Sequence, residues 1–138
     1  MRTRITAAGL TAAAALLTLT ACGSEPEKPV GLTAQSMVDQ LRDLYPLPND
    51  RDNTDFCNDG KGHKDSCKQL ITTDPVSVYE LPTIASAAKW TKQMDGVNDN
   101  KAVQAGRFML IWKADYPSHK DAVAEMTKRA QELAAAEK

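Results

Sequence analysis

The first 21 residues decide how much of this 138-residue chain is available to fold into a domain. Arg2 and Arg4 precede a nearly uninterrupted apolar run, Ile5 to Leu19, that is rich in alanine and leucine. This run is shorter than the roughly 20 residues that a helix needs to cross a bilayer. A short basic segment, a short apolar core and small residues after it are typical of a secretory signal peptide. We therefore expect residues 1–21 to be removed and to contribute nothing to the fold.

The apolar run ends in a sequence that predicts a covalent modification. The stretch Leu19-Thr20-Ala21-Cys22 resembles the lipobox of bacterial lipoproteins. The resemblance implies that the Cys22 sulfur is lipidated, that the chain is cut just before it, and that the new amino group receives an acyl chain such as palmitate. Two acyl chains hold a protein stably on a bilayer, whereas one holds it only marginally. We therefore expect a lipid anchor at the extracytoplasmic face of the cell membrane. The alternative is an ordinary secretory signal in which the cysteine is accidental.

The charge and composition of the remaining chain exclude some classes of function. Residues 22–31 contain two prolines and no apolar periodicity, so we expect a lipidated tether there and a single domain over residues 32–138. Arg2 and Arg4 are the only charged residues before Cys22, so their removal changes the net charge from −1 to −3. Such a chain lacks the overall basic field that attracts nucleic acid. Aromatic residues make up only 5% of the sequence, so we also expect no cofactor in a large aromatic pocket.

Two further cysteines lie in a long polar stretch, residues 46–66, that has almost no apolar periodicity. With Cys22 lipidated, Cys57 and Cys67 are the remaining pair in an oxidising compartment, and we expect them to form a disulfide. Nine residues separate them, whereas redox motifs separate their cysteines by two. The predicted disulfide is therefore structural, and it closes a loop that is uncommonly long for a compact domain.

The same stretch also offers candidate metal ligands. Residues 55–60 read Asp-x-Cys-x-Asp-Gly, which resembles the start of a calcium loop. A cysteine stands at the third position, and Ser66 stands where the bidentate glutamate of such a loop belongs. The simpler interpretation is that these aspartates form turns by bonding to their own backbone. We expect no metal site, and a metal-dependent or hydrolytic module using the Asp-rich loop 50–65 is the alternative.

Hydrophobic periodicity predicts an α+β domain. We expect helices over residues 34–45, 84–94 and 119–136 and strands over residues 69–73, 76–81 and 107–113. The segment from Val97 to Gln104 is predicted to be a polar connection, and the following apolar run is predicted to be the most buried strand. The stretch from Val76 to Lys113 is long enough for a right-handed crossover between parallel strands. We expect a small sheet of two to three strands with helices packed on one face, and one disulfide-closed loop.

The middle of the chain carries a second resemblance. Residues 67–83 read CKQLITTDPVSVYELPT, with a Cys-containing loop before them and an Ala-rich helix and a hydrophobic strand after them. This pattern resembles a set of small actinobacterial lipoproteins, over residues 57–116 together with the lipobox. The resemblance implies the source and the topology. The family has no assigned activity, so no catalytic residue is transferred from it.

No arrangement of residues predicts an enzyme. The two histidines, His63 and His119, lie in a polar loop and at the start of a predicted helix, and neither neighbours a nucleophile motif. We expect no catalytic residue and interpret the chain as a binding domain for a protein or another envelope component. An immunity or exclusion lipoprotein of a mobile element is a further alternative.

The cysteine loop is the predicted contact surface. Polar loops that are held by a rigid scaffold carry binding residues more often than the scaffold does. Trp90 has two interpretations, because it can be half-buried at the sheet edge or exposed as an interface residue. The candidate binding residues are Phe56, Asp59, His63 and Trp90, with Tyr45 as a further aromatic anchor.

Overall fold

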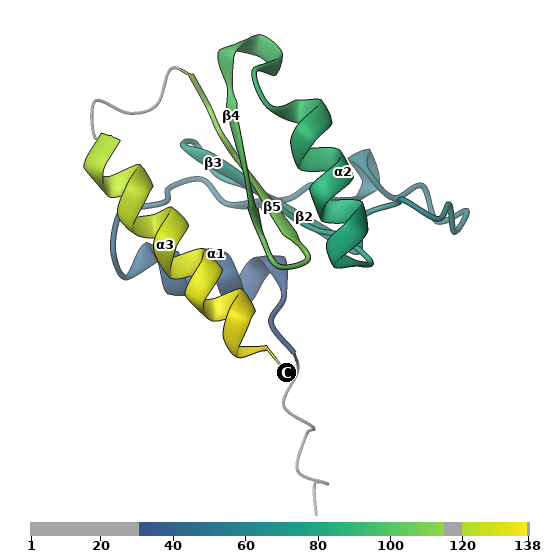
Figure 1. Ribbon diagram of the computed structural model, residues 1–138, viewed down its shortest axis with the longest axis horizontal. Helices are drawn as coiled ribbons and strands as arrows, with labels where there is room; N and C mark the ends of the chain where they lie inside the picture. Colours follow the sequence, from purple (N-terminus) through teal and green to yellow (C-terminus); the bar gives the residue numbers. More distant parts are fainter. Residues whose placement is uncertain (1–30, 115–119, 138) are drawn as a thin grey trace, which may run out of the picture.

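The computed structural model describes residues 31–114 and 120–137, which form an α+β domain (Figure 1). Its helices are α1 (Ala34–Arg42), α2 (Ile84–Met94) and α3 (Lys120–Ala136), with short 3₁₀ turns η1 (Thr54–Phe56) and η2 (Val97–Asp99). Its strands are β1 (Arg51–Asp52), β2 (Gln69–Thr72), β3 (Val76–Glu80), β4 (Lys101–Ala105) and β5 (Phe108–Trp112). The predicted signal peptide, the lipidation site Cys22 and most of the predicted tether lie outside the described residues, as does His119.

The five strands form one antiparallel sheet in the order β1-β2-β3-β5-β4. The sheet is larger than the predicted two to three strands. The predicted parallel pairing across the segment from Val76 to Lys113 is wrong, because β3 pairs antiparallel with β5. Strands β3 and β4 both run antiparallel to β5, so they are parallel to each other. The chain therefore crosses from β3 through α2 to β4, and β5 then returns between the two strands.

The two strands that the sequence did not predict lie at the sheet edges. Strand β4 occupies part of the segment that was predicted to be a polar connection, and β1 has only two residues, both exposed. The apolar residues of β4 are mostly alanines, and only Ala102 and Ala105 are buried, so its alternation is weak. The β4–β5 hairpin closes through Gly106 and the residue after it. Gly106 has a φ of +58°, a conformation that glycine adopts without strain.

Helices cover both faces of the sheet, which corrects the predicted packing on one face. Phe108, Leu110 and Trp112 of β5 belong to a first core cluster with residues of α1 and α3. Met109 and Ile111 point to the opposite face and belong to a second cluster with residues of α2. Figure 1 shows α1 and α3 on one side of the sheet and α2 on the other. All five residues of β5 are buried, so the prediction that it is the most buried strand is confirmed.

The helices begin close to the residues that the sequence predicts. The side chain of Thr33 accepts a hydrogen bond from the backbone N–H of Ser36 (3.1 Å) and so caps α1. Thr83 caps α2 in the same way, accepting from the N–H of Ser86 (3.0 Å). Helix α1 ends earlier than predicted, and Tyr45 packs against the first cluster beyond its end. Among the residues that the structure describes, no helix has the length and apolar character to span a membrane.

One half-buried side chain connects both ends of the domain to the sheet. Arg107, in the β4–β5 turn, donates to the carbonyl of Leu32 (2.5 Å), to both carboxylate oxygens of Glu137 (2.7 and 3.1 Å) and to the carboxylate of Glu80. Glu80 also accepts from the backbone N–H of Ala34 (3.3 Å). Leu32 precedes α1 and Glu137 follows α3, so the guanidinium of Arg107 connects the start and the end of the domain.

Candidate functional site

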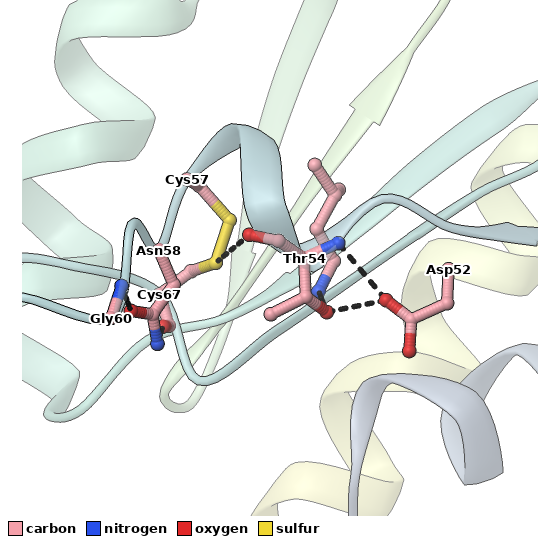
Figure 2. The surroundings of a disulfide bond; sticks show 7 residues. Asp52, Thr54, Cys57, Asn58, Gly60 and Cys67 are labelled. Atoms are coloured by element: carbon pink, nitrogen blue, oxygen red, sulfur yellow. Dashed lines mark hydrogen bonds between the residues drawn. A yellow bond between two sulfur atoms is a disulfide. The ribbon is translucent and has the colours of Figure 1, made fainter.

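The predicted disulfide between Cys57 and Cys67 is present and closes the polar loop (Figure 2). The two Cα atoms are 5.5 Å apart, which is the usual separation for a disulfide. Cys67 is buried, Cys57 is half-buried, and both pack in the second cluster on the α2 face of the sheet. The backbone N–H of Cys67 also donates to the carbonyl of Cys57 (3.2 Å). A covalent bond and a hydrogen bond thus join the two ends of the loop, and apolar packing fixes them to the core.

Thr54 fixes the segment that precedes the disulfide through hydrogen bonds to Asp52 and Leu70 (Figure 2). The carboxylate of Asp52 accepts from its hydroxyl (2.5 Å) and from its backbone N–H (2.9 Å). These two bonds hold the pKa of Asp52 below its usual value, the hydroxyl bond having the larger effect. The Thr54 hydroxyl also accepts from the N–H of Leu70 in β2 (3.1 Å). Turn η1 is therefore attached directly to the sheet.

Asn58 organises the other side of the loop base. Its amide group donates to the carbonyl of Cys67 (2.9 Å), and its carbonyl oxygen accepts from the N–H of Gly60 (3.0 Å). These bonds are of the kind by which asparagine forms turns with nearby backbone. The sequence predicts bonds of this kind for the aspartates of the loop, and the carboxylate of Asp59 accepts one from the backbone N–H of Lys61.

Phe56 lies immediately before the disulfide, at the end of η1, and its side chain is 87% exposed. Its backbone N–H donates to the carbonyl of Asn53 (3.0 Å), and the N–H of Cys57 donates to the carbonyl of Thr54 (3.0 Å). The backbone around Phe56 is therefore held in place while the ring is in solvent. The other large apolar residues that are exposed among the described residues, Leu44, Ile84 and Val97, range from 41% to 65% exposed.

Asp59 and His63 are brought together at the tip of the loop. Oδ2 of Asp59 lies 3.4 Å from Nε2 of His63, and Oδ1 accepts from the backbone N–H of Lys61 (3.0 Å). The bond from Lys61 and then the charge of His63 lower the pKa of Asp59. Both side chains are largely exposed, and ion pairs in such surroundings contribute little to folding stability. The pair is thus available to a partner.

A contact that the sequence did not predict ties the loop to α2. Asp65 accepts from the ammonium group of Lys89 (2.7 Å), and the hydroxyl of Ser86 lies 3.5 Å from the same carboxylate. The hydrogen bond from Lys89 lowers the pKa of Asp65. Loop and helix are distant in sequence, so only the topology brings these residues together. The loop therefore lies against the N-terminal half of α2.

The structure does not gather all the candidate aromatic residues on one surface. Trp90 is half-buried against the second cluster, as one of its two interpretations predicted, and Tyr45 packs on the opposite face of the sheet. Phe56 is the candidate that projects fully into solvent. The loop with Phe56, Asp59 and His63 is therefore the candidate binding surface, and Trp90 packs against the same cluster as the disulfide.

The described residues do not assemble a metal centre: they contain no cluster of three or more His, Cys, Asp or Glu side chains that could hold an ion. Cys57 is in the disulfide, so its sulfur is not a thiolate ligand. The carboxylates of Asp52, Asp59 and Asp65 accept hydrogen bonds from Thr54, Lys61 and Lys89, respectively.

Comparisons with protein-family models, with curated proteins and with solved structures found no match to this chain. The fold and the loop define this protein as an α+β domain with a disulfide-closed surface loop.

Proposed function

We propose that this protein is a non-catalytic binding domain, held by a lipid at Cys22 on the extracytoplasmic face of the cell membrane. It binds a protein partner of the cell envelope through the disulfide loop, with Phe56 as the central contact. The observation that carries the proposal is an aromatic side chain, 87% exposed, on backbone that is fixed on both sides. The lipid anchor is supported by the lipobox at residues 19–22 and by an N-terminal run typical of signal peptides.

When a partner binds, the Phe56 ring is buried and the loop loses conformational freedom. Burial of an aromatic ring removes a large apolar area from water, and aromatic residues are enriched at the centres of protein interfaces. A flexible loop would lose conformational freedom on binding, which weakens affinity. Here the disulfide and the hydrogen bonds of Thr54 and Asn58 order the loop base beforehand. The exposed pair of Asp59 and His63 supplies polar contacts near the ring.

A photo-crosslinking experiment in the producing cell tests the proposal. The full-length chain carries Phe56→p-benzoylphenylalanine, and a matched control carries the same residue at Ile84, which is 65% exposed at the start of α2. We expect a discrete adduct of one mass from position 56 and none from position 84. Equal adducts from both positions, or none from position 56 while the protein is present at the membrane, would contradict the proposed surface.

Two variants separate the loop from the anchor. Replacement of residues 58–66 by a short Gly-Ser linker should abolish the adduct from position 56, and unchanged crosslinking would remove the loop from the proposal. Cys22→Ala should release the protein from the membrane fraction, because the acyl attachment point is gone. Retention of the Cys22→Ala variant in that fraction would contradict the lipid anchor. The linker variant tests the loop independently of the anchor.

A further inference from the structure

A second surface lies at the opposite end of β4 and β5 from the Arg107 turn. An open cavity of about 590 Å³ lies between the end of this hairpin and α3, over the first three turns of the helix. Its volume is in the range of sites for small molecules. The residues that decide its character are Lys101, Trp112, Lys113, Lys120, Val123 and Lys128.

The packing of α3 explains where the cavity forms. Near its C-terminus the helix lies close to the sheet, because a Cβ on Gly106 would be only 2.9 Å from the Cβ of Ala134. In the middle of the helix, Met126 and Ala130 are fully buried in the first cluster. Before Met126, the side chains are at most half-buried, and Val123 lines the cavity. The space therefore opens where α3 stops making close contact with β4 and β5.

The charges around the cavity have one predominant sign. Four lysines and one acidic residue, Asp99, line it, although the whole chain has a net charge of −1. Lys113 donates to the carbonyl of Thr73 (2.5 Å), and Lys128 lies 4.0 Å from Glu132. Within residues 31–114 and 120–137, the ammonium groups of Lys101 and Lys120 have no hydrogen-bond or ion-pair partner. Two uncommitted ammonium groups at one cavity attract an anion.

Trp112 adds a buried donor to the same wall. It is 3% exposed, it is the cross-strand partner of Lys101, and it lines the cavity. Its indole Nε1 is buried and has no hydrogen-bond acceptor among the residues that the structure describes. Buried polar groups are rarely left without a partner, so an unpaired donor of this kind points to an acceptor that the described part of the chain does not provide. Because this nitrogen is closed to solvent here, a ligand reaches it only after the indole ring moves.

We propose that this cavity binds a small organic anion. The ammonium groups of Lys101 and Lys120 hold its carboxylate or phosphate oxygens, one of which accepts from the indole N–H of Trp112. The apolar part of the ligand lies against Val123 and Ala124, which line the cavity from α3. This site shares no residue with the disulfide loop and does not depend on the function proposed for the loop.

Nuclear magnetic resonance of the purified full-length chain with Cys22→Ala tests the site, because each tryptophan gives one indole N–H signal. Trp90→Phe identifies the Trp112 signal, since Trp90 belongs to the cluster on the opposite face of the sheet. The probes are benzoate, phenyl phosphate, inorganic phosphate and neutral benzyl alcohol. We expect the Trp112 signal to shift saturably with benzoate or phenyl phosphate. The probe that binds more tightly, benzoate or phenyl phosphate, identifies the anionic group that the site prefers. Benzyl alcohol, which has no charge, should not shift the Trp112 signal.

A double variant and a matched control assign the binding to the lysines. Lys101→Gln with Lys120→Gln should weaken binding at least roughly tenfold, because each neutralised lysine loses a charge-assisted hydrogen bond. Lys61→Gln with Lys64→Gln removes the same charge from the disulfide loop and should leave the affinity for the organic anions unchanged. An unmoved Trp112 signal with both organic anions, or equal affinity in the two double variants, would overturn the proposal. Inorganic phosphate that binds as tightly as phenyl phosphate would overturn the apolar part.

Discussion

Replacement of Arg107 by methionine measures how strongly one side chain holds the ends of the domain. Arg107→Met keeps most of the aliphatic stem but removes the charge and every hydrogen bond of the guanidinium. The Arg107 and Glu80 side chains are 19% and 9% exposed, so the variant leaves a nearly buried carboxylate whose remaining partner is the N–H of Ala34. Removing one partner of a buried ion pair costs about 3–5 kcal/mol. Because Arg107 retains some exposure, we expect a loss near the lower limit, about 3 kcal/mol.

Urea unfolding with the disulfide intact is the appropriate assay. For a slope m of about 1.5 kcal/mol per M, a loss of about 3 kcal/mol lowers the midpoint by roughly 2 M without changing m. Arg129→Met is the control, because Arg129 is 45% exposed and 4.0 Å from its acidic neighbour Glu132. We expect this control to lie within about 0.5 kcal/mol of the unmodified protein.

A double variant tests the reason for the loss and not only its size. If the cost comes from an unpaired buried carboxylate, Glu80→Gln should relieve part of it in the Arg107→Met background. The double variant should then be more stable than the sum of the two single losses predicts. A loss below about 1 kcal/mol for Arg107→Met, or strict additivity in the double variant, would show that an unpaired buried carboxylate is not the source of the loss.

Three further predictions concern the rest of the domain. The pKa of Glu137 is held below its usual 4.5 by the hydrogen bond and the charge of Arg107, so its contribution to stability is present above pH 4.5 and is lost as the pH falls through the lowered value. The urea midpoint should therefore fall less between pH 7 and about pH 3 in Glu137→Gln than in the unmodified protein; equal decreases would contradict this. Reduction of the Cys57–Cys67 disulfide should lower the free energy of unfolding by about 2.8 kcal/mol, measured by urea unfolding with and without reductant. A change below about 1 kcal/mol would be inconsistent with an ordered loop. Gly106→Ala should destabilise by about 1–3 kcal/mol in thermal unfolding, because it combines a φ of +58° with the 2.9 Å approach to Ala134, and a neutral result would mean that the hairpin relaxes.

Local signals in the sequence predict the helices and the disulfide well. Thr33 and Thr83 stand where caps are expected, and both accept the capping hydrogen bond. Cys57 and Cys67 are the pair left once Cys22 is assigned to lipid, and they are bonded. These features depend on residues close in sequence or on the small number of cysteines, so they can be derived without knowledge of the topology.

Features that arise from tertiary packing could not be predicted in this way. Strand β4 has too few large apolar residues to show an alternating pattern, and it becomes a strand because β5 offers it a free edge. The apolar run of β5 shows that this strand is buried but not that helices cover both its faces. In the loop, the exposure of Phe56 and the bond between Asp65 and Lys89 follow from how η1 and α2 are placed. The cavity lysines come from β4, from the residue after β5 and from α3, so no spacing in the sequence connects them.

The position of Arg107 also determines where an attachment at either end of the domain lies relative to the cavity. Because its guanidinium holds Leu32 and Glu137 at one corner, an attachment at either end of the domain leaves from the same side. The cavity lies at the other end of the β4–β5 hairpin, beside Lys101 and Trp112. A reporter or an affinity tag attached at the C-terminal end of α3 is thus at the opposite end of the hairpin from the cavity. An immobilised protein of this design would present its lysine-lined opening to the solution.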